Sequence, residues 1–250
     1  MTISLAGRRA LVTGASRGIG RAVALVLAAE GARVAVHYGR DAKAAEAVRR
    51  ELAGSGHAVL GCDLADPAQA ASLADRAAEA LDGLDIVVNN AGVYDRHDLH
   101  EHGWLETWNR TLAVNLTAPA LVIAGALPHL ERAPRAHIVN VSSRGAYRGE
   151  PQAPAYGAGK AGLNALSQSL AQALAPRGIV VVGVAPGWVL TDMTRGYLEG
   201  PEGEAIRAQS PAGRVATAAE VAAVVALAVS GRADALQGAI IDVNCASYLR

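Results

Sequence analysis

Tyr156 and Lys160 stand four residues apart, downstream of a glycine-rich segment and of an Asn-Asn-Ala-Gly segment. A free tyrosine is a poor acid or base near neutral pH, because its ordinary pKa is about 10. A lysine one helical turn further on projects from the same helix face, and its positive charge favours the phenolate. This spacing predicts that Tyr156 acts as a general acid and base whose pKa Lys160 lowers. An isolated pair of this kind is also typical of an ordinary amphipathic helix. The surrounding elements must therefore show whether the pair is catalytic.

Short β-rich runs alternate with alanine-rich runs of helical length along the chain. This alternation predicts an α/β fold of the doubly wound (Rossmann) type, with a seven-stranded parallel sheet and helices on both faces. Its ligand crevice is expected at the carboxyl ends of the strands. The strands are expected at 10–13, 33–38, 58–62, 85–89, 137–142, 179–184 and 238–243. The clearest helices are expected at 18–30, 41–52, 66–81, 155–175 and 217–229.

Two irregular regions are expected within this single dinucleotide-binding domain, which we place at residues 1–250. Pro119 should bend or divide the helix expected between Trp104 and Leu130, because proline lacks the N–H that a helix interior needs. The Gly- and Pro-punctuated stretch after the sixth strand has weak periodicity. We interpret its residues, about 188–215, as a mobile substrate lid.

A glycine-rich turn joins the first strand to the first helix. Where side chains are missing, the backbone can approach a pyrophosphate at the helix N-terminus. The alternative is that the glycines only allow close packing of strand and helix. The turn residues expected to bind the cofactor are Gly14, Ser16, Arg17, Gly18, Ile19 and Gly20.

The residues after the second strand favour NADPH over NADH. An acidic side chain there would bind the adenosine ribose hydroxyls, but the chain has Tyr38 and Arg40 instead. Arg17 and Arg40 could clamp a 2′-phosphate through charge-assisted hydrogen bonds, or both could be ordinary surface arginines. The wall of the cofactor site is expected to continue through Asp63, at the adenine amino edge, and through Leu64, Asn89, Asn90, Ala91 and Gly92.

The order of these segments resembles the short-chain dehydrogenase/reductase family along nearly the whole chain. The resemblance rests on TGASRGIG at 13–20, NNAG at 89–92, VNLTAP at 114–119, a serine thirteen residues before Tyr156, the YxxxK pair, and a PG turn followed by a threonine. It implies that Tyr156 donates a proton to a substrate carbonyl while the nicotinamide supplies the hydride. It also implies that Lys160 lowers the pKa of Tyr156 and binds the nicotinamide ribose.

The resemblance assigns further roles by position. Ser143, rather than the adjacent Ser142, would hold the carbonyl oxygen, and Asn115 would position a water that relays protons to the lysine. The alternative for Asn115 is a buried amide that satisfies a helix irregularity. Thr191 could also cap a lid helix. The expected nicotinamide contacts are Pro186, Gly187, Val189 and Thr191.

Within the family, the chain most resembles the bacterial 3-oxoacyl-acyl-carrier-protein reductases, in PGWVLTDMTR at 186–195, AQSPAGR at 208–214 and GAIIDVNCASYLR at 238–250. This implies NADPH-dependent reduction of a 3-oxoacyl thioester or a related ketone, with an acidic acyl carrier protein as a possible partner. Arg177 would meet the carrier near the site mouth. A second expected arginine falls on Pro134, and the usual C-terminal glycine pair reads Asn244 and Cys245.

Two other functions stay open at this point. One is an NAD-dependent alcohol or sugar dehydrogenase, and the other is a nucleotide-binding regulator that has lost turnover. The family resemblance also implies a homotetramer, formed through the helices at 104–130 and 155–175 and the last strand.

Composition argues against several other classes of protein. The chain carries 23 basic and 23 acidic side chains, which gives no electrostatic footprint for nucleic acid or an anionic membrane. No signal peptide and no bilayer-spanning segment are expected, so the location is expected to be cytoplasmic. Cys62 and Cys245 follow no metal spacing. His97, His100 and His102 suggest a metal at first sight, but HxxHxH suits no common zinc pattern, and no metal is expected.

Overall fold

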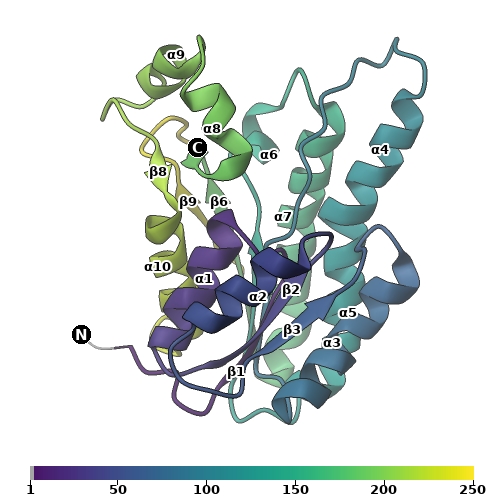
Figure 1. The fold of residues 1–250 in the computed structure, drawn as a ribbon, viewed down its shortest axis with the longest axis vertical. Helices are drawn as coiled ribbons and strands as arrows, with labels where there is room; N and C mark the ends of the chain where they lie inside the picture. The colour runs from purple at the N-terminus through teal and green to yellow at the C-terminus, as the bar shows by residue number, and fades with distance from the viewer. Residues whose placement is uncertain (1–2) are drawn as a thin grey trace.

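The computed structural model describes residues 3–250 and has a seven-stranded parallel sheet at its centre (Figure 1). The strand order is β3-β2-β1-β4-β5-β6-β9, which confirms the doubly wound fold. The order reverses between β1 and β4, and the ligand crevice of such a sheet opens at this point. The strands are β1 (Arg9–Val12), β2 (Arg33–Tyr38), β3 (Ala58–Gly61), β4 (Ile86–Asn89), β5 (Ala136–Val141), β6 (Ile179–Pro186) and β9 (Ile240–Val243).

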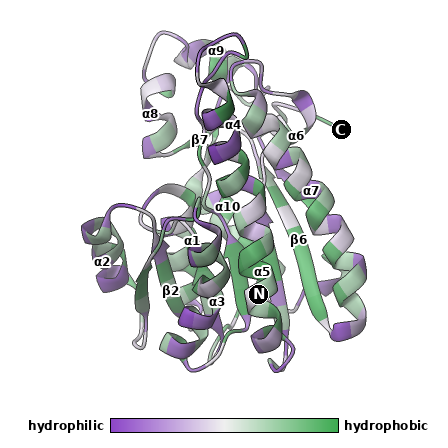
Figure 2. Ribbon diagram, turned by 90° about the vertical axis from the view of Figure 1, so that its right-hand side faces the viewer, coloured by the Kyte–Doolittle hydropathy of each residue, from purple (hydrophilic) through white to green (hydrophobic). Residues whose placement is uncertain are grey.

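Helices cover both faces of the sheet, and the ribbon of the strands is coloured largely as hydrophobic (Figure 2). Apolar side chains fill the two layers between the sheet and the helices. The alternation of a strand explains how one sheet serves both layers: Ala10 and Val12 pack on one face, and Leu11 packs on the other. The first face carries α1 (Gly18–Ala29), α2 (Ala42–Glu51) and α10 (Ala218–Val229). The second carries α3 (Pro67–Leu81), α5 (Ala118–Leu130) and α7 (Pro154–Leu174).

Side-chain caps lie at the expected starts of three helices, residues 41, 66 and 217. The Asp41 carboxylate accepts a hydrogen bond from the Ala44 N–H at 2.9 Å, and Asp66 accepts from Ala68 at 2.9 Å. At α10, Thr217 accepts from the Glu220 N–H at 3.2 Å, while the Glu220 carboxylate accepts from the Thr217 N–H at 2.8 Å. These contacts satisfy N–H groups that the helix itself leaves without partners.

The helix between Trp104 and Leu130 is divided, as the sequence predicts, but by a widened turn just before the proline. It consists of α4 (Trp104–Leu112), a π turn (Ala113–Thr117) and α5. Pro119 has no N–H to bond the carbonyl of Asn115, four residues earlier. The Ala118 N–H bonds back to the Ala113 carbonyl instead. The irregularity is therefore centred on Asn115.

This same segment corrects one expectation. It is 27 residues long with a mean hydropathy of 1.6 in its most apolar window, so length and composition alone would allow it to cross a bilayer. The expectation that no segment has those properties is wrong. The apolar side chains of this helix pack on its neighbours α3 and α7, which explains why a helix of the core is so apolar.

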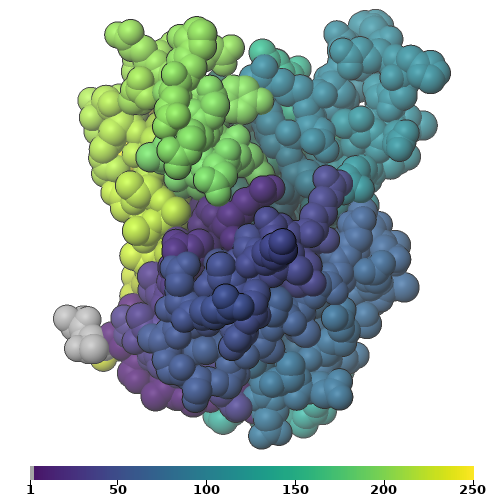
Figure 3. Space-filling model, in the orientation of Figure 1, coloured from purple at the N-terminus to yellow at the C-terminus, as the bar shows by residue number. Residues whose placement is uncertain are grey.

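The segment interpreted as a lid, residues 188–215, leaves the sheet after β6 and lies above the carboxyl ends of the strands (Figure 1). It contains β7 (Val189–Leu190), α8 (Asp192–Leu198) and α9 (Gly203–Ala208). The chain returns through β8 (Ala216–Thr217), which pairs with β7. In the space-filling view the green lid and the blue-teal α4 region rise on either side of the purple β1–α1 region (Figure 3).

Candidate active site

Three elements bring the predicted catalytic side chains together at the carboxyl edge of the sheet. Ser143 follows β5, Asn115 lies in the π turn, and Tyr156 and Lys160 occupy the first turns of α7. The Ser143 hydroxyl accepts a hydrogen bond from the Gly145 N–H at 3.0 Å, which fixes its rotamer next to the Tyr156 phenol. The Lys160 Nζ lies 5.8 Å from the centroid of the Tyr156 ring.

Lys160 is buried, and its ammonium is held by the backbone of β5. Its Nζ donates to the Val141 carbonyl at 2.7 Å, and desolvation lowers the pKa of the amine to about 8. The Ser142 hydroxyl donates to the Lys160 carbonyl at 3.2 Å. Ser142 thus ties α7 to the end of β5, as expected for a residue that supports the backbone rather than the chemistry.

The Asn115 side chain is fixed by the strand-end loop after β4. Its Oδ1 accepts from the Val93 N–H and its Nδ2 donates to the Val93 carbonyl, both at 2.9 Å. A Cβ added to Gly92 would lie 3.3 Å from this Oδ1 and 3.4 Å from the Lys160 Nζ. Asn115 and Lys160 therefore both border Gly92. The Asn115 amide therefore forms its hydrogen bonds with the backbone of the loop at Val93. The alternative interpretation would require it to bond backbone groups of the irregular helix.

Burial sets the proton affinity of Tyr156 in this structure. Desolvation raises its pKa to about 12, nearby Glu150 and Tyr94 act in the same direction, and the hydrogen bond with Ser143 offsets part of the effect. This shift is opposite to the lowering that the spacing predicts, and Lys160 is not among its causes. The physical reason is that the Lys160 ammonium is directed to the Val141 carbonyl and lies over the ring.

Thr13, which the sequence argument did not single out, joins the two strand ends at the switch point. Its hydroxyl oxygen accepts from the Asn90 N–H at 2.9 Å and from the Ala91 N–H at 3.0 Å. The Asn90 amide donates in return to the Thr13 carbonyl at 2.9 Å and to the Gly14 carbonyl at 3.2 Å. Asn90 thus shapes the glycine-rich turn through its side chain.

The glycine-rich turn fits a dinucleotide pyrophosphate. A Cβ on Gly20 would lie 2.4 Å from both the Asn90 Nδ2 and the Gly14 carbonyl oxygen, so only glycine fits there. Gly14 and Gly18 have φ values of +63° and +56°. Arg17 begins α1 without a side-chain cap, which leaves the first N–H groups of a 12-residue helix free for an anion.

His37 is a second residue that sequence reasoning missed. It is 1% exposed, and its Nδ1 accepts the Gly14 N–H at 3.1 Å. Its Nε2 lies 3.2 Å from the Cys62 carbonyl, so the neutral ring with the proton on Nε2 satisfies both contacts. Desolvation lowers its pKa to about 4. The ring therefore links the ends of β1, β2 and β3 beneath the glycine-rich turn.

The residues expected to select the cofactor lie around this turn. Arg17 and Arg40 are exposed, and neither forms an ion pair within the described residues 3–250. The Tyr38 ring covers Gly61, whose added Cβ would lie 2.6 Å from the phenol oxygen. The exposed Asp63 carboxylate accepts from the Ala65 N–H at 2.9 Å, whereas the adjacent Leu64 is buried.

Asn89 differs from its expected role at the cofactor wall. Its side chain is buried in the sheet, where Nδ2 donates to the Asn140 Oδ1 at 2.9 Å, and Asn140 donates to Ser167 at 2.8 Å. The cause is strand alternation, which turns successive side chains to opposite faces. The Asn89 side chain therefore joins β4, β5 and α7 and faces away from the turn.

The PG turn and the start of the lid approach the glycine-rich turn. Gly187 is packed against the C-terminal segment, because an added Cβ would lie 2.9 Å from the Asn244 Cβ. Thr191 begins α8, where its N–H donates to the Thr194 hydroxyl at 3.1 Å, and Thr194 also donates to the Val189 carbonyl. A Cβ on Gly18 would lie 3.4 Å from Thr191. Thr191 thus begins the lid helix and also stands beside the phosphate turn.

Tyr94 borders Tyr156, and a second aromatic pair is formed by Trp188 and Tyr197. The Tyr94 and Tyr156 rings meet edge to face with centroids 5.0 Å apart, and Trp188 lies 5.8 Å from Tyr197. The Arg96 guanidinium lies over the Tyr197 ring at 4.6 Å. Tyr94 lies two residues after NNAG, a position that could have been found from the sequence. Within residues 3–250, no three His, Cys, Asp or Glu side chains are grouped as metal ligands would be.

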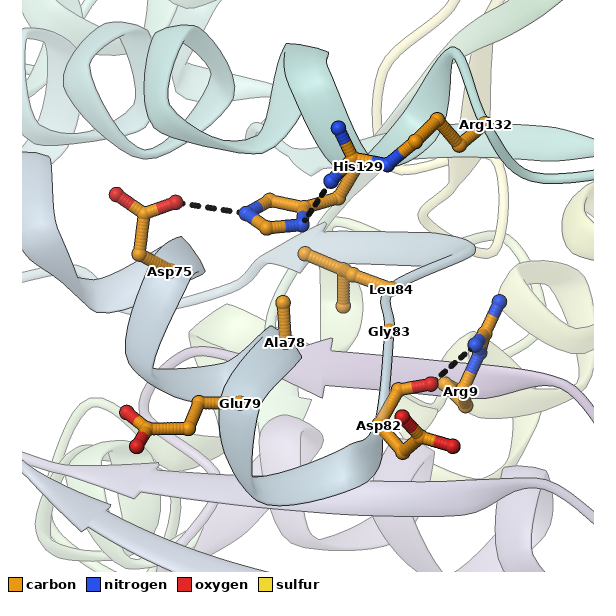
Figure 4. Close-up of a pocket in the computed structure, with 9 residues that line it drawn as sticks. All are labelled: Arg9, Asp75, Ala78, Glu79, Asp82, Gly83, Leu84, His129 and Arg132. Carbon is orange, nitrogen blue, oxygen red and sulfur yellow. Dashed lines mark hydrogen bonds and ion pairs between the residues drawn. The ribbon is translucent and has the colours of Figure 1, made fainter.

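Arg177, the arginine expected to meet a carrier protein, lies away from the site of its own chain. It lies just before β6 begins, whereas Pro186, at the other end of β6, borders the site. Within one chain Arg177 is therefore at the opposite edge of the sheet, and it forms an ion pair with Glu131. A surface hollow at that edge, near the start of β1, contains none of the predicted site residues (Figure 4). It is lined by Arg9, Asp75, Ala78, Glu79, Asp82, Gly83, Leu84, His129 and Arg132.

Comparisons with known proteins agree with this geometry. A family model described as enoyl-(acyl carrier protein) reductase matches residues 14–245. The 3-oxoacyl-[acyl-carrier-protein] reductase FabG of Escherichia coli is 37% identical over 243 residues, with 97% of this chain and 98% of the relative covered. The cis-4-hydroxycyclohexanecarboxylate dehydrogenase of Sinomonas cyclohexanicum is 38% identical over 244 residues, with 96% of each chain covered.

Among solved structures, a short chain dehydrogenase from Burkholderia cenocepacia, crystallised in complex with NADP, is 37% identical with a TM-score of 0.90. The likeness covers 97% of this chain and 98% of that chain. The relatives thus share both sequence and fold with this chain over nearly its whole length. This similarity includes the region of the glycine-rich turn and of the cluster formed by Ser143, Tyr156, Lys160 and Asn115. The chain belongs to the short-chain dehydrogenase/reductase family of oxidoreductases, which act on CH–OH and C=O groups.

Proposed function

We propose that this protein reduces a ketone to a secondary alcohol with NADPH, and that Tyr156 donates the proton. The observation that carries the proposal is the convergence of Ser143, Tyr156, Lys160 and Asn115 beside the glycine-rich turn. When bound, the nicotinamide supplies the hydride. The protein's residues hold the carbonyl and deliver the proton.

Tyr156 carries its proton near neutral pH, as a proton donor must, although its raised pKa makes it a weak acid until the carbonyl oxygen gains charge. A pKa of about 12 keeps its phenol protonated near neutral pH, so the hydroxyl can donate to a carbonyl oxygen that gains charge. The Ser143 hydroxyl, whose oxygen accepts from Gly145, keeps its own proton for the same carbonyl oxygen. Lys160 and the Asn115 turn border Gly92 and would bind the nicotinamide ribose and return a proton to the tyrosine.

The cofactor is NADPH, and two exposed arginines are available to bind its 2′-phosphate. Arg17 stands at the start of α1 and Arg40 follows β2, and both are exposed guanidinium groups without acidic partners in residues 3–250. Arginine binds a phosphate through paired donors, whereas NADH would call for an acidic residue after β2. The relative from Burkholderia cenocepacia was crystallised with NADP, which supports this choice.

Two substrate classes have support. The name of the Escherichia coli relative supports a 3-oxoacyl thioester on an acyl carrier protein. The name of the Sinomonas relative supports a ketone that carries a carboxylate, since oxidation of its hydroxy acid gives such a ketone. An arginine next to Ser143 favours the second class. We further propose a cytoplasmic homotetramer, as in the family resemblance.

Initial rates of NADPH and NADH oxidation test this function. We expect turnover with NADPH on acetoacetyl carrier protein or on free ketones, and we expect Arg17→Ala and Arg40→Ala to raise the KM for NADPH but not for NADH. Arg195→Ala, at an exposed lid arginine, is the matched control. A protein that binds NADPH but turns over no ketone in a broad panel would instead be a nucleotide-binding regulator, and a preference for NADH would indicate a dehydrogenase that uses NAD.

A further inference from the structure

Arg144, the residue after Ser143, is a buried cation that forms no direct ion pair within residues 3–250. It is 3% exposed, and no carboxylate oxygen lies within 4.0 Å of its guanidinium nitrogens in residues 3–250. Its acceptors are neutral: the Gln209 Oε1 at 2.5 Å and the Ser247 carbonyl at 3.3 Å. Desolvation of an unpaired charge is costly, so such a group needs either a structural or a ligand-binding reason.

A second arginine converges on the same neutral oxygen. Arg148, at the end of α6 (Gly145–Arg148), donates to the Gln209 Oε1 at 3.3 Å. One amide oxygen thus accepts from two guanidinium groups, although it carries only a partial negative charge. A carboxylate matches two such donors better, because it adds the attraction of opposite charges and offers two oxygens that can accept from both guanidinium groups.

Gln209 belongs to the lid, directly after α9, whereas both arginines belong to the segment that follows the catalytic serine. The Arg144 N–H donates to the Pro186 carbonyl at 2.9 Å, so its backbone is also joined to the PG turn. A displacement of the lid would therefore leave the two arginines with the catalytic segment. The amide oxygen is the part of the contact that the lid can withdraw.

The net charge around the Gln209 Oε1 favours the binding of a ligand with one negative charge. Glu150 is half-buried and lies near both arginines, and its carboxylate also faces Tyr94 and Tyr156. Two guanidinium groups and one carboxylate leave a single positive charge. That balance favours a carboxylate over a phosphate dianion as the ligand.

We propose that Arg144 and Arg148 form a carboxylate-binding subsite for the substrate, and that the Gln209 amide oxygen occupies this subsite when the lid covers it. This proposal rests on the proposed function and makes it more specific. The substrate is a ketone that carries a carboxylate several bonds from its carbonyl. The ketone lies at Ser143 and Tyr156 while the carboxylate replaces Gln209 on the two guanidinium groups.

A matched pair of ligands tests the subsite without turnover. The probes are 4-oxocyclohexanecarboxylate and its methyl ester, which share one ring and differ in charge. Their Kd values are measured by calorimetry on full-length Tyr156→Phe protein saturated with NADPH. We expect the acid to bind at least tenfold more tightly than the ester, because two charge-assisted hydrogen bonds depend on its charge.

Three variants in the same background locate this preference. Arg148→Gln, at an exposed position, should reduce the acid-to-ester ratio to about threefold or less. Gln209→Glu should do the same by placing the lid's own carboxylate on both arginines, and it should also raise the Tm. Arg195→Gln, at a lid arginine that pairs with Glu199, should keep the full ratio.

Equal binding of acid and ester would overturn the subsite, as would a ratio that Arg148→Gln leaves intact. Wild-type turnover separates this result from the proposed function. A protein that reduces both ketones equally with NADPH keeps the proposed function and loses the subsite. A protein that binds the acid through Arg148 but oxidises no NADPH keeps the subsite and loses the proposed function.

Discussion

His37 should make the stability of the protein fall steeply between pH 7 and pH 5. The ring is 1% exposed and its pKa in the folded protein is about 4, whereas histidine in an unfolded chain has a pKa of about 6.5. Because the folded pKa is the lower one, the unfolded chain binds more protons as the pH falls below 6.5. The stabilisation is therefore present above pH 6.5 and is lost toward pH 4.

The two pKa values give the size of the effect. At pH 5 the unfolded histidine is almost fully protonated and the folded one is almost neutral, so the loss from pH 7 to pH 5 is about 2 kcal/mol. The full loss below pH 4 is about 3 kcal/mol, since each unit of pKa difference corresponds to about 1.4 kcal/mol. This is a large fraction of a typical free energy of unfolding.

Urea unfolding of wild type, His37→Asn and His100→Asn at pH 7 and pH 5 tests this reasoning at one protein concentration. In His37→Asn the introduced amide keeps an acceptor for the Gly14 N–H but does not titrate, so we expect the pH-dependent loss of this variant to be about 2 kcal/mol smaller than that of wild type. His100 is exposed, and the free energy of unfolding of His100→Asn should fall between pH 7 and pH 5 by as much as that of wild type. Equal losses in wild type and His37→Asn would refute the assignment.

Two further predictions follow from the backbone around the site. Gly20→Ala should weaken NADPH binding at least tenfold in a fluorescence titration, because its Cβ would lie 2.4 Å from the Asn90 Nδ2 and the Gly14 carbonyl oxygen; an unchanged Kd would show that the turn does not need glycine there. Cys245 has a φ of +53°, a left-handed conformation that favours glycine, so Cys245→Gly should raise the free energy of unfolding by up to about 1 kcal/mol. A loss of stability in urea unfolding would contradict that account.

The Cys245 case also shows how sequence and structure inform each other. The sequence departs here from the usual glycine pair, and the structure has Cys245 and Ala246 at φ values of +53° and +58°. Of the pair Asn244 and Cys245, only Cys245 therefore has a left-handed backbone, and Ala246 after it shares that conformation. Such a position can be suspected from a family pattern, but only the backbone shows which residues adopt the conformation.

Local signals predicted most of the fold. The strands and helices follow from hydrophobic periodicity and from caps such as Asp41, Asp66 and Thr217, which act within three residues of themselves. The cluster of Ser143 and Tyr156 was also predictable, because the family spacing carries it. These features depend on short stretches of chain.

Features that depend on distant partners were not predictable. The Asn89 side chain lies on the face of the sheet that carries α7, because side chains alternate along a strand. An error of one residue in the predicted position of the strand would place this side chain on the opposite face. Arg144 meets Gln209 across 65 positions of sequence, and His37 meets Cys62 across 25. The effect of burial on the pKa of Tyr156 exceeds what spacing alone suggests, because desolvation depends on every neighbouring element.

The most direct test of the central claim is the rate of NADPH oxidation by wild type and Tyr156→Phe with the same ketone. Phenylalanine keeps the ring that meets Tyr94 but removes the proton donor. We expect kcat to fall by roughly 10²- to 10⁴-fold while the Kd for NADPH changes by less than about threefold, because general acid catalysis contributes on that scale. A variant that keeps wild-type turnover would contradict the assignment of Tyr156 as the proton donor.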